Sequence, residues 1–167
     1  GDYDASRAEL ERCLAAMRAI GDREGEAAAL VGLASRTWDL GDIAAAGQLF
    51  ATAHGIAVSE SAISSAIGLA KIAAHEDRFD DAAALQRAAL DAARAAADRD
   101  CVAATLQEIG VTEWFAGHTE IARPALLESL AIYRRVGDRY SQMRSLWCLG
   151  NIALDAGQME TARAYYL

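Results

Sequence analysis

The sequence repeats itself with a period of 40 residues, and this period restricts what the chain can fold into more than any other feature. A short turn motif that usually begins with glycine recurs at positions 1, 41, 77, 117 and 157. Three of the four spacings are 40 residues and one is 36. A constant period of this length is typical of arrays in which each unit packs mainly on its neighbours. The sequence therefore predicts a repeat architecture.

Each repeat is predicted to contain two helices. The chain has one proline and is rich in alanine, the residue with the highest helix propensity. A second turn falls halfway between the anchors, at Gly21-Asp22-Arg23, Ala97-Asp98-Arg99 and Gly137-Asp138-Arg139. Glycine stops a helix and the following aspartate can cap the next one. The predicted helices span residues 3–20, 24–39, 43–58, 62–76, 79–96, 101–115, 119–136, 140–155 and 159–167.

The short repeat lacks the halfway turn at residues 58–61. The missing segment has the length of about one helical turn, roughly 3.6 residues. Losing one turn shortens a helix with little rotation of its apolar face. We therefore expect the array to continue through this repeat without a break.

Small residues recur at fixed distances from the anchors. Five residues after an anchor stand Ala46, Ala82, Ala122 and Ala162. Seven residues before an anchor stand Ala34, Ala70, Gly110 and Gly150. Because a small side chain lets a neighbouring helix approach closely, these positions predict where helices stack.

The last two repeats carry a recognisable set of such positions. They are Leu106, Ile109, Gly110, Gly117, Ala122 and Leu126, followed by Leu146, Leu149, Gly150, Ala153, Gly157, Ala162 and Tyr166. This pattern resembles the tetratricopeptide repeat, in the lengthened form found in kinesin light chains, cell-polarity adaptors and LuxR-type or antibiotic-regulatory bacterial transcription regulators. The resemblance implies an all-α fold, a right-handed α-solenoid of stacked antiparallel helix pairs with about nine helices.

The domain organisation is predicted to be simple. No linker or change of composition interrupts residues 1–167, which we expect to form a single repeat domain with anchors at 1, 41, 77, 117 and 157. The chain begins with Gly1 rather than methionine, and its last residues stand inside a helical pattern. We therefore expect it to be a fragment of a longer protein.

Charge and composition exclude several kinds of partner. The net charge of −8 argues against direct contact with nucleic acid, because such surfaces neutralise phosphates with lysine and arginine. No apolar run approaches the roughly 18 residues that a membrane span needs, and no signal peptide opens the chain. The three cysteines have no metal-binding spacing and are expected to be reduced, packed thiols. We expect a cytoplasmic protein without membrane contact.

No motif for catalysis is recognisable. The three histidines do not stand at the i, i+4 spacing of a helical metal pair, and no glycine-rich phosphate-binding motif or nucleophile motif occurs. We expect no enzyme activity, no metal site and no cofactor.

A second helical face, about 140° from the core positions, contains all three tryptophans and the single lysine. In the family that the chain resembles, this face lines a concave groove that binds peptides. The candidate groove residues are Trp38, Asp39, Lys71, His75, Gln107, Trp114, Phe115, Arg144, Trp147, Asn151 and Asp155. The aromatic side chains would be apolar anchors for a bound peptide, and the other residues would recognise its polar groups. The tryptophans could instead pack on an adjacent helix or on repeats outside this chain.

The function suggested by these observations is a protein- or peptide-binding scaffold. The resemblance favours the sensor or interaction region of a bacterial multidomain transcription regulator. The alternative is a small-molecule effector domain with an aromatic pocket inside the superhelix. Exposed terminal helices would also favour self-association. We expect alanine at Trp147 and Arg144 to weaken partner binding with little effect on the thermal melt.

Overall fold

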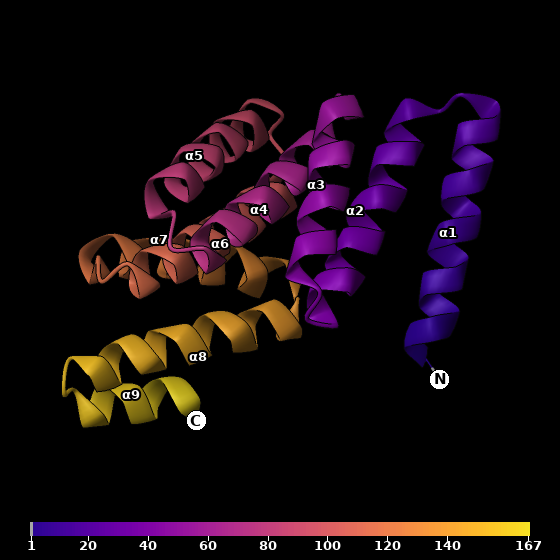
Figure 1. The fold of residues 1–167 in the computed structure, drawn as a ribbon. Helices are drawn as coiled ribbons and strands as arrows, with labels where there is room; N and C mark the ends of the chain where they lie inside the picture. The colour runs from indigo at the N-terminus through magenta and orange to yellow at the C-terminus, as the bar shows by residue number, and fades with distance from the viewer. Residues whose placement is uncertain (1) are drawn as a thin grey trace. The chain divides into compact units, whose positions relative to one another are not determined.

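The computed structural model describes residues 2–167, with side chains from residue 5 onward. These residues form nine α-helices and no β-strand, which confirms the all-α class (Figure 1). The predicted helix boundaries agree with the observed ones to within two residues. The first anchor, Gly1, lies outside the described residues. The helices are α1 Asp2–Ile20, α2 Arg23–Asp39, α3 Ile43–Ile56, α4 Glu60–His75, α5 Phe79–Ala95, α6 Arg99–Phe115, α7 Thr119–Val136, α8 Arg139–Asp155 and α9 Met159–Tyr166.

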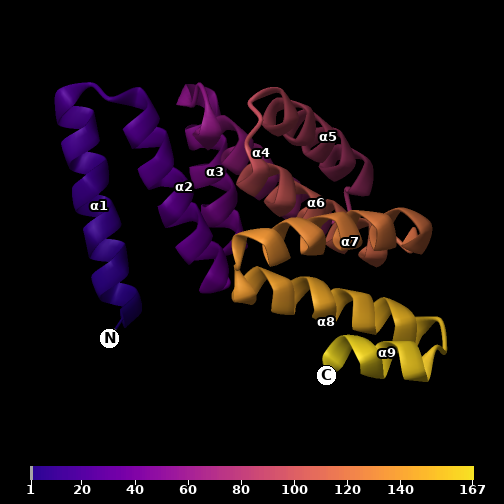
Figure 2. The same ribbon diagram turned by 180° about the vertical axis from the view of Figure 1, so that it is seen from behind.

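The chain consists of two compact units, one ending at Ala89 and the other beginning at Leu90. In the first unit each of α1 to α4 packs on the next helix in sequence, and α2 also contacts α4. In the second unit α6 to α9 pack in the same manner, and α6 also contacts α8 (Figures 1 and 2). Contacts between a helix, the next one and the next but one are those of stacked helix pairs.

The turns have the conformations that the sequence predicts. Gly41, Gly117 and Gly157 adopt left-handed backbone with φ between 70° and 87°, and the anchor Asp77 does so with φ of 58°. Aspartate side chains cap the following helices: Asp22, Asp42, Asp98 and Asp138 accept hydrogen bonds from backbone N–H groups in the first turns of α2, α3, α6 and α8. Local chemistry in the sequence therefore sets the starts of these four helices.

The small residues lie where helices meet. Ala46, Ala82 and Ala122 are fully buried and Ala162 is 1% exposed. A Cβ atom on Gly110 would lie 2.4 Å from Cγ of Leu126, so α6 and α7 approach each other at a distance that only glycine allows there. In the second unit the main core contains Ala122, Leu126, Leu130, Cys148, Leu149 and Ile152. The stacking role predicted for the small positions is confirmed.

The short repeat replaces its missing turn with a contact from another helix. Ser59, the N-cap residue of α4, makes no side-chain capping bond. Instead, Glu24 of α2 accepts hydrogen bonds from the backbone N–H groups of Val58 and Ser61, each at 3.0 Å. Burial alone would raise the pKa of Glu24, but the hydrogen bonds from Ser61 and Val58 lower it from 4.5 to about 2. A carboxylate from α2 thus caps α4.

Replacing Glu24 with glutamine should reveal this cap as a pH-dependent difference. We expect E24Q to lower the free energy of unfolding by about 1 kcal/mol at pH 7, the size of a helix cap on a partly exposed site. The folded-state pKa is depressed, so the stabilisation is fully present above pH 4.5 and is lost as the pH falls towards 2. Urea denaturation of both proteins at pH 7, 4 and 3 measures this difference. E120Q, at the exposed start of α7, should show none, and a difference for E24Q that is constant over this pH range would contradict the cap.

No helix in residues 2–167 combines the length and the apolar character that a membrane span requires.

Candidate functional site

The predicted groove residues are divided between the two units. Trp38, Asp39, Lys71 and His75 lie in the first unit, on α2 and α4. The other seven lie in the second, on α6 and α8. Each set is described separately.

In the first unit, Trp38 is enclosed by residues of α4. The Lys71 ammonium lies 5.2 Å from the centre of the indole, within the range of a cation–π contact. The His75 ring meets Trp38 edge-on, with ring centres 5.7 Å apart. Trp38 is half-buried and also packs against the core around Phe50. The chain itself therefore supplies the cation at this tryptophan.

In the second unit, three aromatic rings form one cluster. Phe115 stacks on Trp114 with ring centres 4.9 Å apart, and Trp147 of α8 meets Trp114 edge-on at 5.9 Å. The Trp114 indole Nε1–H donates to the Asp155 carboxylate at 2.7 Å. We call Trp114, Phe115, Trp147 and Asp155 the aromatic surface. The sequence hypothesis placed all four on one face, and the structure brings them together.

The aromatic surface is open to solvent. Phe115 is 67% exposed and Trp147 is 54% exposed. Single exposed apolar residues are ordinary, but adjacent exposed aromatic rings form a patch of the kind that marks interaction sites. The alternative interpretation, that the tryptophans pack on an adjacent helix, accounts for Trp114, which packs against the core of the second unit. Trp147 contacts Trp114 of α6 but still leaves more than half of its surface exposed.

An apolar stripe along α8 extends this surface, and sequence reasoning missed it. Tyr140, Met143, Trp147 and Leu154 are spaced so that they share one helical face. Their exposure ranges from 40% at Leu154 to 73% at Tyr140. The spacing around Trp147 was visible in the sequence, but comparison of repeat positions alone does not reveal a stripe along a single helix.

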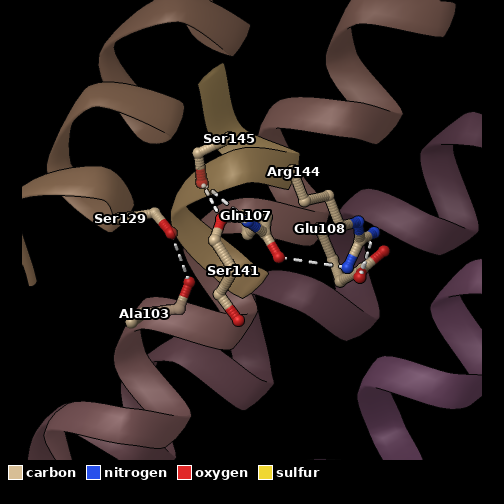
Figure 3. A network of polar contacts seen from close by, with 7 residues as sticks. All are labelled: Ala103, Gln107, Glu108, Ser129, Ser141, Arg144 and Ser145. Carbon is tan, nitrogen blue, oxygen red and sulfur yellow. Dashed lines mark hydrogen bonds and ion pairs between the residues drawn. The ribbon is translucent and has the colours of Figure 1, made fainter. Parts of the chain in front are cut away.

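A polar network joins α6 to α8 (Figure 3). The Gln107 amide nitrogen donates to the backbone oxygen of Ser141 at 2.8 Å and to Oγ of Ser145 at 2.6 Å. Its amide oxygen accepts from Arg144 at 3.1 Å. Gln107 is 2% exposed. It therefore holds two helices together, and this replaces the reading role that the sequence hypothesis gave it.

Arg144 belongs to the same network. Its guanidinium forms an ion pair with Glu108, whose side chain is 8% exposed, while that of Arg144 is 33% exposed (Figure 3). Burial alone would lower the pKa of Arg144, but the Glu108 carboxylate raises it above its usual value. This ion pair argues against the expectation that Arg144 can be replaced with little effect on stability. Sequence analysis did not single out Glu108, because its partner lies one repeat away.

Asn151 also has a partner within the chain. The Tyr166 hydroxyl of α9 donates to the Asn151 amide oxygen at 2.6 Å. The Tyr166 ring also occupies the space that a Cβ on Gly150 would fill. Asn151 thus helps to fasten α9 to α8.

The three thiols lie in different environments. Cys101 and Cys148 are buried, whereas Cys13 is exposed, contrary to the prediction that all three are packed. Burial raises the pKa of Cys148 to about 11. Since the thiolate is the nucleophilic form, Cys148 is protonated and inert near neutral pH.

Comparison with known proteins agrees with this geometry. Residues 61–135 match the family model of the tetratricopeptide repeat. Residues 61–135 therefore contain tetratricopeptide repeats. No curated protein matches its sequence.

Solved structures show how far the repeat fold extends. The crystal structure of BtubC (BKLC) from P. vanneervenii has a TM-score of 0.76 and 18% identity, covering 99% of this chain and 70% of that one. A putative kinesin light chain of Podosopora anserina with nearly identical TPR-like repeats has a TM-score of 0.66 and 17% identity, covering 99% of this chain and 84% of that one. These similarities confirm the solenoid of helix pairs over the described residues.

The tetratricopeptide register relates the two tryptophan clusters. Trp38 and Trp114 each stand three residues before an anchor, Gly41 and Gly117. Each indole contacts a residue that stands two positions before the following anchor, His75 in one unit and Asp155 in the other. The same repeat position therefore presents a tryptophan in two different chemical environments.

Proposed function

We propose that the chain is a protein-interaction scaffold that binds a segment of a partner protein on the aromatic surface and the α8 stripe. The observation that carries this proposal is the exposure of Phe115 and Trp147 beside Trp114. Tryptophan and other large anchors contribute most of the energy at protein interfaces. The tetratricopeptide repeat is a stacking scaffold that leaves such faces free for partners.

The proposal restricts the partner contacts in the second unit to four of the predicted groove residues, of which Phe115, Trp147 and Asp155 are exposed and Trp114 is half-buried. Trp114, Phe115, Trp147 and Asp155 would contact the partner, because they lie together at the surface. Gln107 and Arg144 would hold α6 and α8 together. In the first unit, Trp38, Asp39, Lys71 and His75 would form a separate contact region.

We further propose the biological setting that the resemblance suggests. The scaffold would serve as the sensor or interaction region of a bacterial multidomain transcription regulator, in the cytoplasm and without catalysis of its own. What supports this setting is the 40-residue period, which is similar to that of the lengthened repeats in such regulators.

Selection of peptides on the intact chain tests the binding proposal. A phage-displayed library of random 12-residue peptides is selected on the wild-type protein, and the recovered peptides are synthesised and titrated. We expect F115A/W147A to weaken their binding roughly thirtyfold, because two aromatic anchors each contribute about 1 kcal/mol or more. The unfolding free energy should change by less than about 1 kcal/mol, because both side chains are largely exposed.

A matched control is available in the other unit. Leu40 and Val58 are 60% and 76% exposed, and L40A/V58A should bind the same peptides as the wild type does. Peptides that bind F115A/W147A and wild type with equal affinity would overturn the proposal. Unfolding of F115A/W147A would also overturn it, because the rings would then be structural.

A further inference from the structure

The two tryptophans at equivalent repeat positions differ in the charge that surrounds them. Trp38 has its own cation, since the Lys71 ammonium lies 5.2 Å from the ring centre. Trp114 has instead a carboxylate, Asp155, bonded to its indole nitrogen. The difference points to a ligand of opposite charge at the second tryptophan.

The register explains how this difference arises. Lys71 stands six residues before the anchor at 77, and the residue at the corresponding position before the anchor at 157 is Asn151. Asn151 is neutral, and its amide oxygen accepts from the Tyr166 hydroxyl. The position that supplies a cation in the first unit therefore supplies none in the second.

Arg144, on the same helix as Asp155, does not take the place of Lys71. Its guanidinium is bound to the Glu108 carboxylate and to the amide oxygen of Gln107. These contacts direct its charge towards α6. The charge of Arg144 is therefore already paired with the Glu108 carboxylate.

Aromatic rings and a carboxylate together form a site for a cation. The face of an aromatic ring carries negative charge, and tryptophan binds cations more strongly than the other aromatic residues do. Trp114 and Trp147 meet at an interplanar angle of 81°, so their faces point in different directions. Asp155, within 2.7 Å of the Trp114 nitrogen, adds a full negative charge beside them.

We propose that a lysine or arginine side chain of the bound partner occupies this corner, against Trp114 and Trp147 and beside Asp155. This inference rests on the proposed function and names the side-chain chemistry that the aromatic surface recognises. The net charge of −8 favours a basic partner by steering the two molecules together.

The α8 stripe identifies the source of the cation as a protein segment. Tyr140, Met143 and Leu154 lie on the same helical face as Trp147 and are exposed. From Tyr140 to Leu154 the helix rises about 21 Å, at 1.5 Å per residue. An extended segment of about six residues spans this length, at roughly 3.3 Å per residue. A free small cation would not contact the apolar side chains along this stripe.

Nuclear magnetic resonance of the indole N–H groups tests the proposal on the intact chain. The three tryptophan resonances are assigned by W38F, W114F and W147F. The probes are the acetylated peptide amide Leu-Ala-Arg-Ala-Leu and the same peptide with neutral citrulline in place of arginine. We expect the arginine peptide to shift the Trp114 and Trp147 resonances with about fivefold higher affinity than the citrulline peptide. The Trp38 resonance should not move, because Lys71 already occupies that ring.

Two variants, D155N and N151K, assign the preference to this site, and D39N is the control. D155N should reduce the arginine-to-citrulline affinity ratio to about one, whereas D39N, beside Trp38, should leave it at about five. N151K places a lysine at the repeat position that Lys71 occupies in the first unit. Its ammonium should take the place of the partner's cation, so N151K should also abolish the preference for the arginine peptide. Equal affinity of the two peptides for the wild type, or a ratio unchanged in D155N, would overturn the proposal.

Two further measurements separate this inference from its alternatives. N-acetylarginine amide should bind at least tenfold more weakly than the peptide. If N-acetylarginine amide and the peptide bound with equal affinity, the ligand would be a free small cation. The proposal of a partner segment would then be overturned. Library peptides that need Phe115 and Trp147 but contain no basic residue would overturn the cation site and leave the proposed function standing. Library peptides whose affinity does not change in F115A/W147A would overturn the proposed function itself.

Discussion

Replacing Leu126 with alanine should lower the free energy of unfolding of the second unit by about 3 kcal/mol. Leu126 is fully buried in the core that α7 shares with α8, and large-to-alanine changes at such positions cost about 2–5 kcal/mol. The site cannot collapse easily on its α6 side, because Gly110 has no side chain to move into the cavity. Urea denaturation followed by tryptophan fluorescence in a W38F background measures the effect, since Trp114 and Trp147 then report on residues 90–167.

The adjacent residue provides a matched control. Leu127 is 43% exposed on the same helix, so L127A should cost less than about 1 kcal/mol. Equal losses for L126A and L127A would mean that α7 does not pack as described.

Gly110 gives a second check on the same contact. G110A alone should destabilise, because its Cβ would lie 2.4 Å from Cγ of Leu126. In the L126A background that atom is absent, and G110A should cost far less. Additive losses in this double-mutant cycle would contradict the close approach of α6 and α7.

These local contacts show why so much of the fold was predictable from sequence. Helix starts depend on a capping aspartate such as Asp138, and helix ends depend on a left-handed residue such as Gly157. Both signals involve residues that are adjacent in the chain. Because the same signals recur in each repeat, a helix boundary that is wrongly predicted at one turn would disagree with the boundary at the equivalent turn of the next repeat.

The features that were missed depend on residues that are distant in sequence. Glu24 caps α4 through Ser61, which lies 37 residues further along the chain. The sequence near Ser59 gives no signal of this contact. The decisive chemistry of this cap belongs to tertiary structure.

The candidate site was predictable in part for the same reason. Comparison of repeat positions places Trp114, Phe115, Trp147 and Asp155 on one face, because it needs only the helical period. This comparison does not distinguish residues that are exposed to solvent from residues whose side chains bind a residue of the adjacent repeat. Gln107 and Arg144 share that face, yet they bind Ser145 and Glu108 instead of presenting free groups to solvent.

Replacing Arg144 with alanine should lower the free energy of unfolding by about 2 kcal/mol. Removing one partner of a fully buried ion pair costs about 3–5 kcal/mol, because the remaining charge is left without compensation. Here the Glu108 side chain is 8% exposed, but that of Arg144 is 33% exposed, so water screens part of the effect. R144A should also abolish the hydrogen bond to Gln107 and loosen α6 against α8. Urea denaturation in the W38F background measures the loss.

Three variants distinguish a buried pair from an ordinary surface pair. R94A removes the partner of Glu128, with both side chains 53% exposed, and should cost less than about 0.5 kcal/mol. R144K keeps the charge but not the planar guanidinium, and it should fall between R144A and the wild type. R144M/E108L leaves no buried charge and should be more stable than R144A. If R144A matched R94A in stability, the polar network would not fasten α6 to α8, and the aromatic surface would be positioned by apolar packing alone.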